Sequence, residues 1–132
     1  MAEPTVTAHI GSTNYQVILD DSKHTWLADE PESLGGGDRG PDPVTLLASG
    51  LAACTSVTLK MYAQRKGWPL ADVRVAISLE TDDGVSTFDR RIVLEGDLTD
   101  EQRERLLQIA NACPVHKILT GKISVRTGLT VA

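Results

Sequence analysis

"VTLLASGLAACTSVTLKMYAQRK", residues 44–66, predicts one long helix. Asp42 is a good N-cap, Pro43 suits the first helical position, and Gly67 ends the segment. The first half has no charged residue on any face, whereas the second half carries lysine and arginine. A helix that is apolar all round must be covered on all sides, which one small sheet does not achieve. We therefore expect a second sheet or a second subunit against this helix.

Three short strands are predicted before the helix. "TVTAHIG" (residues 5–11) and "YQVILDD" (15–21) alternate apolar and polar residues, so they form a hairpin that turns near residues 12–14. "HTWLA" (24–28) is a third strand. The tract "ADEPESLGGGDRGPDP" (28–43) is rich in glycine, proline and carboxylates, which is typical of a loop.

After the helix the pattern predicts a second hairpin. "LADVRVAISLE" (residues 70–80) alternates apolar and polar residues, "DDG" (82–84) turns the chain, and "TFDRRIVLEG" (87–96) returns. "TDEQ" (99–102) is a capping box that opens a helix through about Asn111.

The chain then ends with a short helix and a last strand. "PVHKIL" (residues 114–119) is the helix, and "KISVRTGLTV" (122–131) shows strand alternation. The predicted order is βββ-α-ββ-αα-β, which is an α+β fold with antiparallel sheets. At 132 residues we expect a single domain over residues 1–132.

Composition and charge exclude several classes of function. The net charge of −5 lacks the basic face that a nucleic-acid-binding protein needs. No basic and apolar leader opens the sequence, and no window of about 18 continuous apolar residues predicts a membrane span. We expect a cytoplasmic protein with reduced thiols, in which a cysteine pair is more often catalytic or metal-binding than structural.

The two cysteines, Cys54 and Cys113, are the candidate site residues. Cys54 lies in the apolar half of the long helix, where Gly50 on its face lets a backbone or ligand approach; small-residue packing is the alternative. If Pro114 begins the short helix, Cys113 is its N-cap, which favours a thiolate; the alternative is a cysteine that fills a tight turn. His116 stands in the first turn of that helix and could add positive charge.

No metal or cofactor is expected. Cys113 and His116 have C-x-x-H spacing, and Cys54 could give a third ligand, but the paired spacings of a structural zinc site are absent. The sequence also has no P-loop, dinucleotide fingerprint or nucleophile elbow.

Residues 40–70 and "NACPVHKILTG" (111–121) together resemble the OsmC/Ohr family of thiol-dependent hydroperoxide reductases, most closely its small OsmC-like branch. The resemblance implies an intertwined homodimer, in which two six-stranded sheets wrap around the two long central helices. It also implies active sites in apolar pockets at the subunit interface. Such a partner would cover the remaining faces of the long helix.

The resemblance also implies residue roles. Cys54 matches the peroxidatic cysteine, which a hydroperoxide oxidises to a sulfenic acid, and Cys113 matches the resolving cysteine, which closes a disulfide. An external dithiol then resets the pair. An apolar pocket would favour organic hydroperoxides over hydrogen peroxide.

The sequence departs from the Ohr pattern at the activating pair. Ohr-type members hold an arginine over the peroxidatic sulfur and orient it with a glutamate from the first turn of the helix, where this chain has Val44 and Thr45. Arg39 is the nearest substitute, and three further arginines could enter from either chain: Arg90, Arg91 and Arg126. The alternative functions are a non-catalytic protein that binds an apolar small molecule in the interface pocket, and a purely structural dimer.

Overall fold

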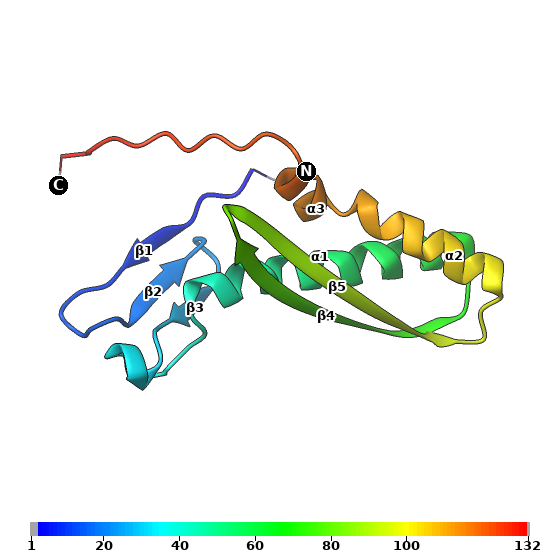
Figure 1. The fold of residues 1–132 in the computed structure, drawn as a ribbon, viewed down its shortest axis with the longest axis horizontal. Coiled ribbons are helices and arrows are strands. Elements are labelled where there is room, and N and C mark those ends of the chain that lie inside the picture. The colour runs from blue at the N-terminus through cyan, green and yellow to red at the C-terminus, as the bar shows by residue number, and fades with distance from the viewer. Residues whose placement is uncertain (1–2, 132) are drawn as a thin grey trace. The chain divides into compact units, whose positions relative to one another are not determined.

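The computed structural model describes residues 3–131 and contains five strands, three α-helices and two short 3₁₀ turns (Figure 1). In chain order they are β1 (Thr7–His9), β2 (Val17–Asp20), β3 (Thr25–Ala28), η1 (Glu32–Leu34), α1 (Pro43–Lys66), β4 (Leu70–Asp82), β5 (Val85–Gly96), α2 (Asp100–Ile109), η2 (Ala110–Ala112) and α3 (Pro114–Thr120). The chain divides into two compact units: the residues up to Gly50 together with Ser78–Phe88, and Leu51–Ile77 together with the residues from Asp89 onward. The prediction of a single domain over residues 1–132 stays a prediction.

The first unit holds a three-stranded antiparallel sheet in the order β1-β2-β3. Leu19 at its centre is paired with Ala8 on one side and with Trp26 on the other. Both the predicted hairpin and the predicted third strand are confirmed. The unit also contains the turn between β4 and β5, where Asp83 and Gly84 have φ values of 52° and 77°. Two successive positive φ angles are those of a type I′ turn, which suits a two-residue hairpin.

The loop after β3 folds around the carboxylate of Asp29, which is 1% exposed. Asp29 Oδ1 accepts hydrogen bonds from the backbone N–H of Glu30 (2.7 Å) and Gly37 (3.3 Å), and Oδ2 accepts one from Arg39 (3.1 Å). The Asp29 N–H donates to Pro41 O at 3.1 Å. These backbone bonds, helped by the nearby charge of Arg39, hold the pKa of Asp29 below its usual range. The predicted loop therefore has a defined conformation.

The core of the second unit lies between α1, α2 and the hairpin strands, and α2 runs alongside α1 (Figure 1). Its buried residues come from α1, β4, α2 and η2: Leu59, Ala63, Leu70, Leu106 and Ala110. The predicted capping box is confirmed, because Thr99 Oγ1 accepts from Gln102 N (3.1 Å) while Gln102 Oε1 accepts from Thr99 N (2.9 Å). This cap fixes the start of α2.

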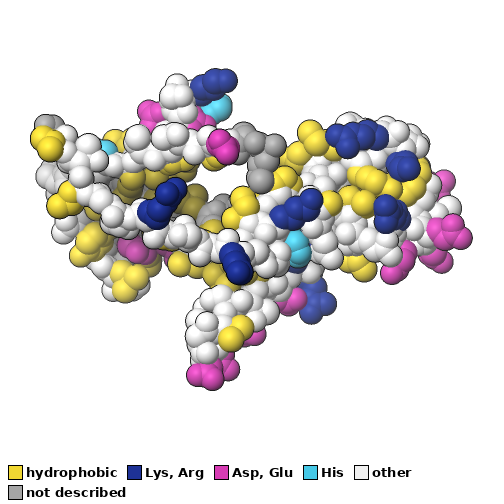
Figure 2. All heavy atoms as spheres, turned by 90° about the horizontal axis from the view of Figure 1, so that it is seen from above, with side chains coloured by type: hydrophobic (Ala, Val, Ile, Leu, Met, Phe, Trp, Pro, Cys, Tyr) yellow, Lys and Arg dark blue, Asp and Glu magenta, His cyan; other side chains and the backbone are white. Residues whose placement is uncertain are grey.

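One stripe of α1 is buried and the rest is open. The buried positions recur every fourth residue: Leu51, Thr55, Leu59 and Ala63. Apolar residues on other faces, among them Leu47, Val57 and Met61, are about half exposed, and Figure 2 shows hydrophobic side chains open at the surface. Within the described chain, α1 is the one helix long and apolar enough to cross a membrane, a test that the core helix of a soluble protein also passes. The apolar surface of α1 is thus only partly covered by its own chain.

The predicted last strand does not form. Residues 122–131 run extended without strand pairing (Figure 1). Its apolar side chains stand in solvent, with Val125 85% and Val131 95% exposed. A strand needs a neighbouring edge to satisfy its backbone groups, and this segment pairs with none in the described part of the chain. The α+β class with antiparallel sheets is confirmed, but the order within the described chain is βββ-α-ββ-αα.

Candidate functional site

Cys54 lies on α1 beside the buried stripe, between Ala53 and the fully buried Thr55. Its side chain is partly exposed. The Cys113 thiol, the backbone N–H of Val115 and the hydroxyl of Thr58 all lie close enough to the Cys54 thiol to act on its pKa. The fold therefore brings the two predicted cysteines together, although 58 residues, 55–112, lie between them along the chain. Both thiols are free.

Cys113 is the residue that joins η2 to α3, and it is 0% exposed. Its sulfur accepts a hydrogen bond from the backbone N–H of His116 at 3.5 Å, and Pro114 occupies the first helical position. The predicted N-cap role of Cys113 is confirmed. Proline at the start of a helix requires no N–H partner, and the Cys113 sulfur satisfies the His116 N–H, one of the remaining orphan donors of the first turn.

Burial raises the pKa of the Cys54 thiol, and the neighbouring Cys113 thiol raises it further. Hydrogen bonds from Val115 N–H and the Thr58 hydroxyl act in the opposite direction and stabilise the thiolate in part. No cation of the described chain contributes to this balance. Within one chain Cys54 is consequently a thiol at neutral pH, and a fast reaction with peroxide requires a cation from elsewhere.

Arg90, on β5, holds together the segments that carry the two thiols. Its Nη1 donates to Thr55 Oγ1 on α1 (3.1 Å) and to Ala110 O (3.4 Å). Its Nη2 donates to Asn111 Oδ1 (3.0 Å) and lies 3.4 Å from Nδ1 of His116 on α3. One guanidinium thus links α1, η2 and α3.

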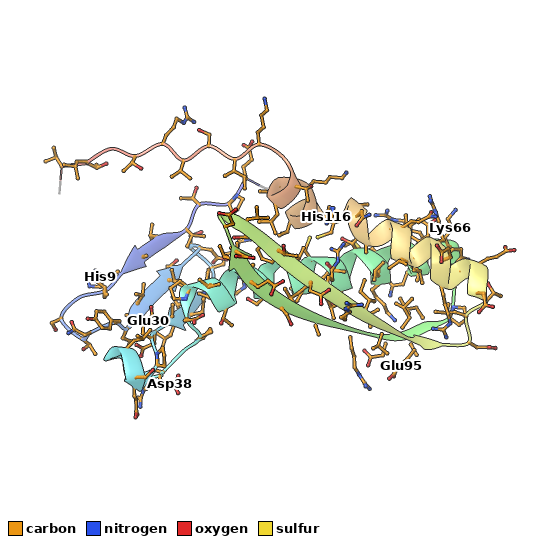
Figure 3. The ribbon with its side chains drawn as sticks, viewed as in Figure 1. His9, Glu30, Asp38, Lys66, Glu95 and His116 are labelled. Atoms are coloured by element: carbon orange, nitrogen blue, oxygen red, sulfur yellow. The ribbon has the colours of Figure 1, made fainter. Side chains whose placement is uncertain are left out.

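His116 is the neutral partner in this network. Burial lowers the pKa of His116, and the positive charge of Arg90 lowers it further. A neutral imidazole offers a lone pair on Nδ1, which can accept from the guanidinium. His116 is labelled on α3 in Figure 3.

The other arginines named from the sequence stand apart from this network. Arg39 belongs to the first unit, where its side chain is exposed and its N–H binds Asp29. Arg91 is exposed and pairs with Asp89 at 3.2 Å. Arg126 is exposed in the extended segment. Whether Arg39 activates Cys54 stays a prediction.

Sequence reasoning did not single out Thr55 and Asn111. Thr55 had a signal, because it is the one polar residue in the stripe of α1 spaced every fourth position from Leu51 to Ala63. Asn111 had no such signal, since its side-chain amide has a role only as the hydrogen-bond acceptor of Arg90, which is distant in the sequence. No group of three potential metal ligands occurs within residues 3–131.

Known proteins are similar to this chain over most of its length. The family described as OsmC-like protein matches residues 35–128. The organic hydroperoxide resistance protein OhrB of Bacillus subtilis is 26% identical over 129 residues, which cover 94% of each chain.

Solved structures show the same fold. The OsmC-like protein of Mycoplasma pneumoniae superposes with a TM-score of 0.77 at 18% identity, covering 91% of this chain and 89% of the other. An organic hydroperoxide resistance protein from Legionella pneumophila gives a TM-score of 0.65 at 25% identity, covering 92% and 91%.

Proposed function

The chain belongs to the OsmC-like family, and on that premise we propose that it is a thiol-dependent peroxidase that reduces organic hydroperoxides. The observation that carries the proposal is the proximity of a partly exposed Cys54 on α1 to a fully buried Cys113 at the start of α3. Relatives named for organic hydroperoxide resistance, at 26% and 25% identity, support the substrate class.

The chemistry proceeds in three balanced steps. The Cys54 thiolate attacks the terminal oxygen of a hydroperoxide, so the O–O bond breaks, an alcohol leaves and the sulfur becomes a sulfenic acid. The Cys113 thiol then attacks this sulfur, which forms the disulfide and releases water. An external dithiol reduces the disulfide by two exchanges and is itself oxidised to a disulfide.

The proposal includes a homodimer with its sites at the interface. Two features of the single chain support it: the open apolar faces of α1 and the unpaired segment 122–131, both of which a second copy could cover. The dimer is also where a cation for Cys54 would enter, with Arg39 as the candidate. The protein would work in a compartment that keeps thiols reduced, which we take to be the cytoplasm.

A single-turnover thiol count tests the proposal. The fully reduced protein receives one equivalent of an organic hydroperoxide or of hydrogen peroxide, and free thiols are titrated within seconds. We expect both thiols to be lost, and lost faster with the organic peroxide. Cys54→Ser should abolish the reaction, whereas Cys113→Ser should oxidise once and then stall at the sulfenic acid. Equally fast thiol loss in Cys54→Ser and in the parent protein would contradict the assignment.

A non-catalytic binder of apolar small molecules is the second candidate. The raised pKa of Cys54 favours it, together with Val44 and Thr45 in place of the first-turn glutamate. In that case the reduced protein would keep both thiols after minutes with peroxide, and would bind an apolar fluorescent probe that a hydroperoxide displaces without being consumed.

A further inference from the structure

Besides the two cysteines, the second unit contains Arg90, a half-buried arginine on β5. Among the described residues no carboxylate forms an ion pair with it. Its acceptors are instead a hydroxyl, a carbonyl, an amide and an imidazole. Arginine has five donors in a rigid fork, so it can bind several segments at once, which lysine cannot do in the same geometry.

The placement of these acceptors ties Arg90 to the cysteine pair. Thr55 follows Cys54 directly on α1, and His116 is the residue whose N–H donates to Cys113 Sγ. Asn111 stands two residues before Cys113. The guanidinium therefore binds residues that lie next to each cysteine in the sequence. It does so from β5, which carries neither cysteine.

The second observation concerns what holds α3 in place. This helix has seven residues, none of which is buried. A helix so short is not stable by itself in water, and most helical stability in proteins comes from packing. Cys113 at its N-cap is buried, whereas Pro114, Val115 and Leu119 of α3 are only partly buried. Among the described residues, the contact of Arg90 with His116 is the side-chain hydrogen bond that joins α3 to the rest of the second unit, and the bond of Arg90 to Asn111 holds the η2 turn that precedes α3.

We propose that Arg90 is a positioning residue for disulfide formation: by holding Asn111 and His116 against Thr55, it keeps Cys113 within reach of Cys54. The inference rests on the proposed function for its role in turnover, where it acts on the step in which the Cys113 thiol attacks the Cys54 sulfenic acid and water leaves. A disulfide requires Cα atoms about 4.4–6.8 Å apart, so a small displacement of α3 is enough to slow that step.

The test is thiol–disulfide equilibrium in a glutathione redox buffer, which needs no peroxide. The fraction of protein with the Cys54–Cys113 disulfide gives the effective concentration of one thiol at the other. Arg90→Met keeps the apolar stem and removes the donors; we expect the effective concentration to fall roughly tenfold, the scale of one lost hydrogen bond to a charged group. Arg90→Lys, which restores a charged donor, should recover part of the loss.

Two controls separate positioning from general destabilisation. Arg91→Met removes the neighbouring arginine of β5, which pairs with Asp89, and should leave the effective concentration unchanged. Leu70→Ala weakens the core of the second unit without touching α3 and should lower the unfolding midpoint but leave the disulfide equilibrium near that of the parent. Circular dichroism confirms that each variant is folded before it is compared.

Each outcome is decisive. An effective concentration for Arg90→Met equal to that of Arg91→Met, or a fall of the same size in Leu70→Ala, would overturn the inference. If Arg90→Met does not fold, Asn111→Ala takes its place and should lower the effective concentration by a smaller factor; no change in it would also overturn the inference. A disulfide that depends on Arg90 in a protein that peroxide does not oxidise would support the inference and refute the proposed peroxidase.

Discussion

Replacing Thr55 by valine removes one hydroxyl from the centre of the second unit while the shape of the side chain is kept. Thr55 is 0% exposed; its Oγ1 donates to Leu51 O (2.7 Å) and accepts from Arg90 Nη1 (3.1 Å). Leu51 O keeps its helical backbone partner in the variant, so the main loss is the acceptor of a charged donor, which is worth about 1.5–3 kcal/mol. Arg90 Nη1 retains the carbonyl of Ala110 at 3.4 Å. We therefore expect the free energy of unfolding to fall by about 1.5 kcal/mol, near the lower end of this range.

Urea unfolding at one fixed protein concentration measures this change, with an unchanged slope as the check on two-state behaviour. Ser56→Ala is the matched control, because Ser56 on the next position of α1 donates only to Ala52 O (2.9 Å). It should cost no more than about 0.5 kcal/mol, as surface substitutions usually do.

A double-mutant cycle of Thr55→Val with Arg90→Met then isolates the bond itself. The coupling free energy should exceed about 1 kcal/mol, whereas independent sites add within about 0.5 kcal/mol. Additive effects on the free energy of unfolding would show that the hydrogen bond between Arg90 and Thr55 contributes no stability.

Four further predictions concern two glycines, the pH dependence of stability and the first-unit loop. Gly96 has φ 145°, and a Cβ there would lie 2.0 Å from Pro69 O, so Gly96→Ala should destabilise the protein by more than about 2 kcal/mol. At Gly50 no described atom lies within 4 Å of such a Cβ, so Gly50→Ala should stabilise the chain by about 0.5–1 kcal/mol. A loss of stability in urea unfolding would instead reveal a second chain at that face of α1. The pKa of His116 is lowered in the folded state. The stability that depends on its neutral ring is therefore complete above its ordinary pKa of about 6.5, and it is lost as the pH falls through the folded pKa. Unfolding midpoints at pH 7 and pH 5 should accordingly differ less in His116→Gln than in the parent. Asp29→Asn removes a charged acceptor from three backbone donors, so limited proteolysis should cut residues 30–40 faster than in the parent, and an unchanged rate would show that the carboxylate does not hold the loop.

The elements that local chemistry determines could be predicted from the sequence. The limits of α1, the capping box at Thr99 and the N-cap at Cys113 each depend on residues within a few positions of one another, and all three agree with the structure. Both hairpins are equally local, because alternation and a short turn specify them. Residues 122–131 have the same alternation but pair with no strand of the described chain, which no pattern within the segment reveals.

The candidate site was predictable in part for the same reason. Residue type alone marks Cys54 and Cys113 as candidates, and the structure places them close to each other. The role of Arg90 depends on β5, α1 and α3 meeting in space, so the sequence offered it only as one of several arginines. Arg39 was preferred because it lies close to α1 along the chain, a criterion that says nothing of where its guanidinium points.

The complete burial of Cys113 makes the two sulfurs unequal toward anything that arrives by diffusion. A bulky alkylating reagent, a metal ion or a stray oxidant meets Cys54 first, because only that thiol has exposed surface. In the proposed cycle Cys113 would then be a reserve reductant, shielded from irreversible damage until a sulfenic acid forms beside it. Irreversible oxidation or alkylation that accumulates over many turnovers should therefore be found at Cys54.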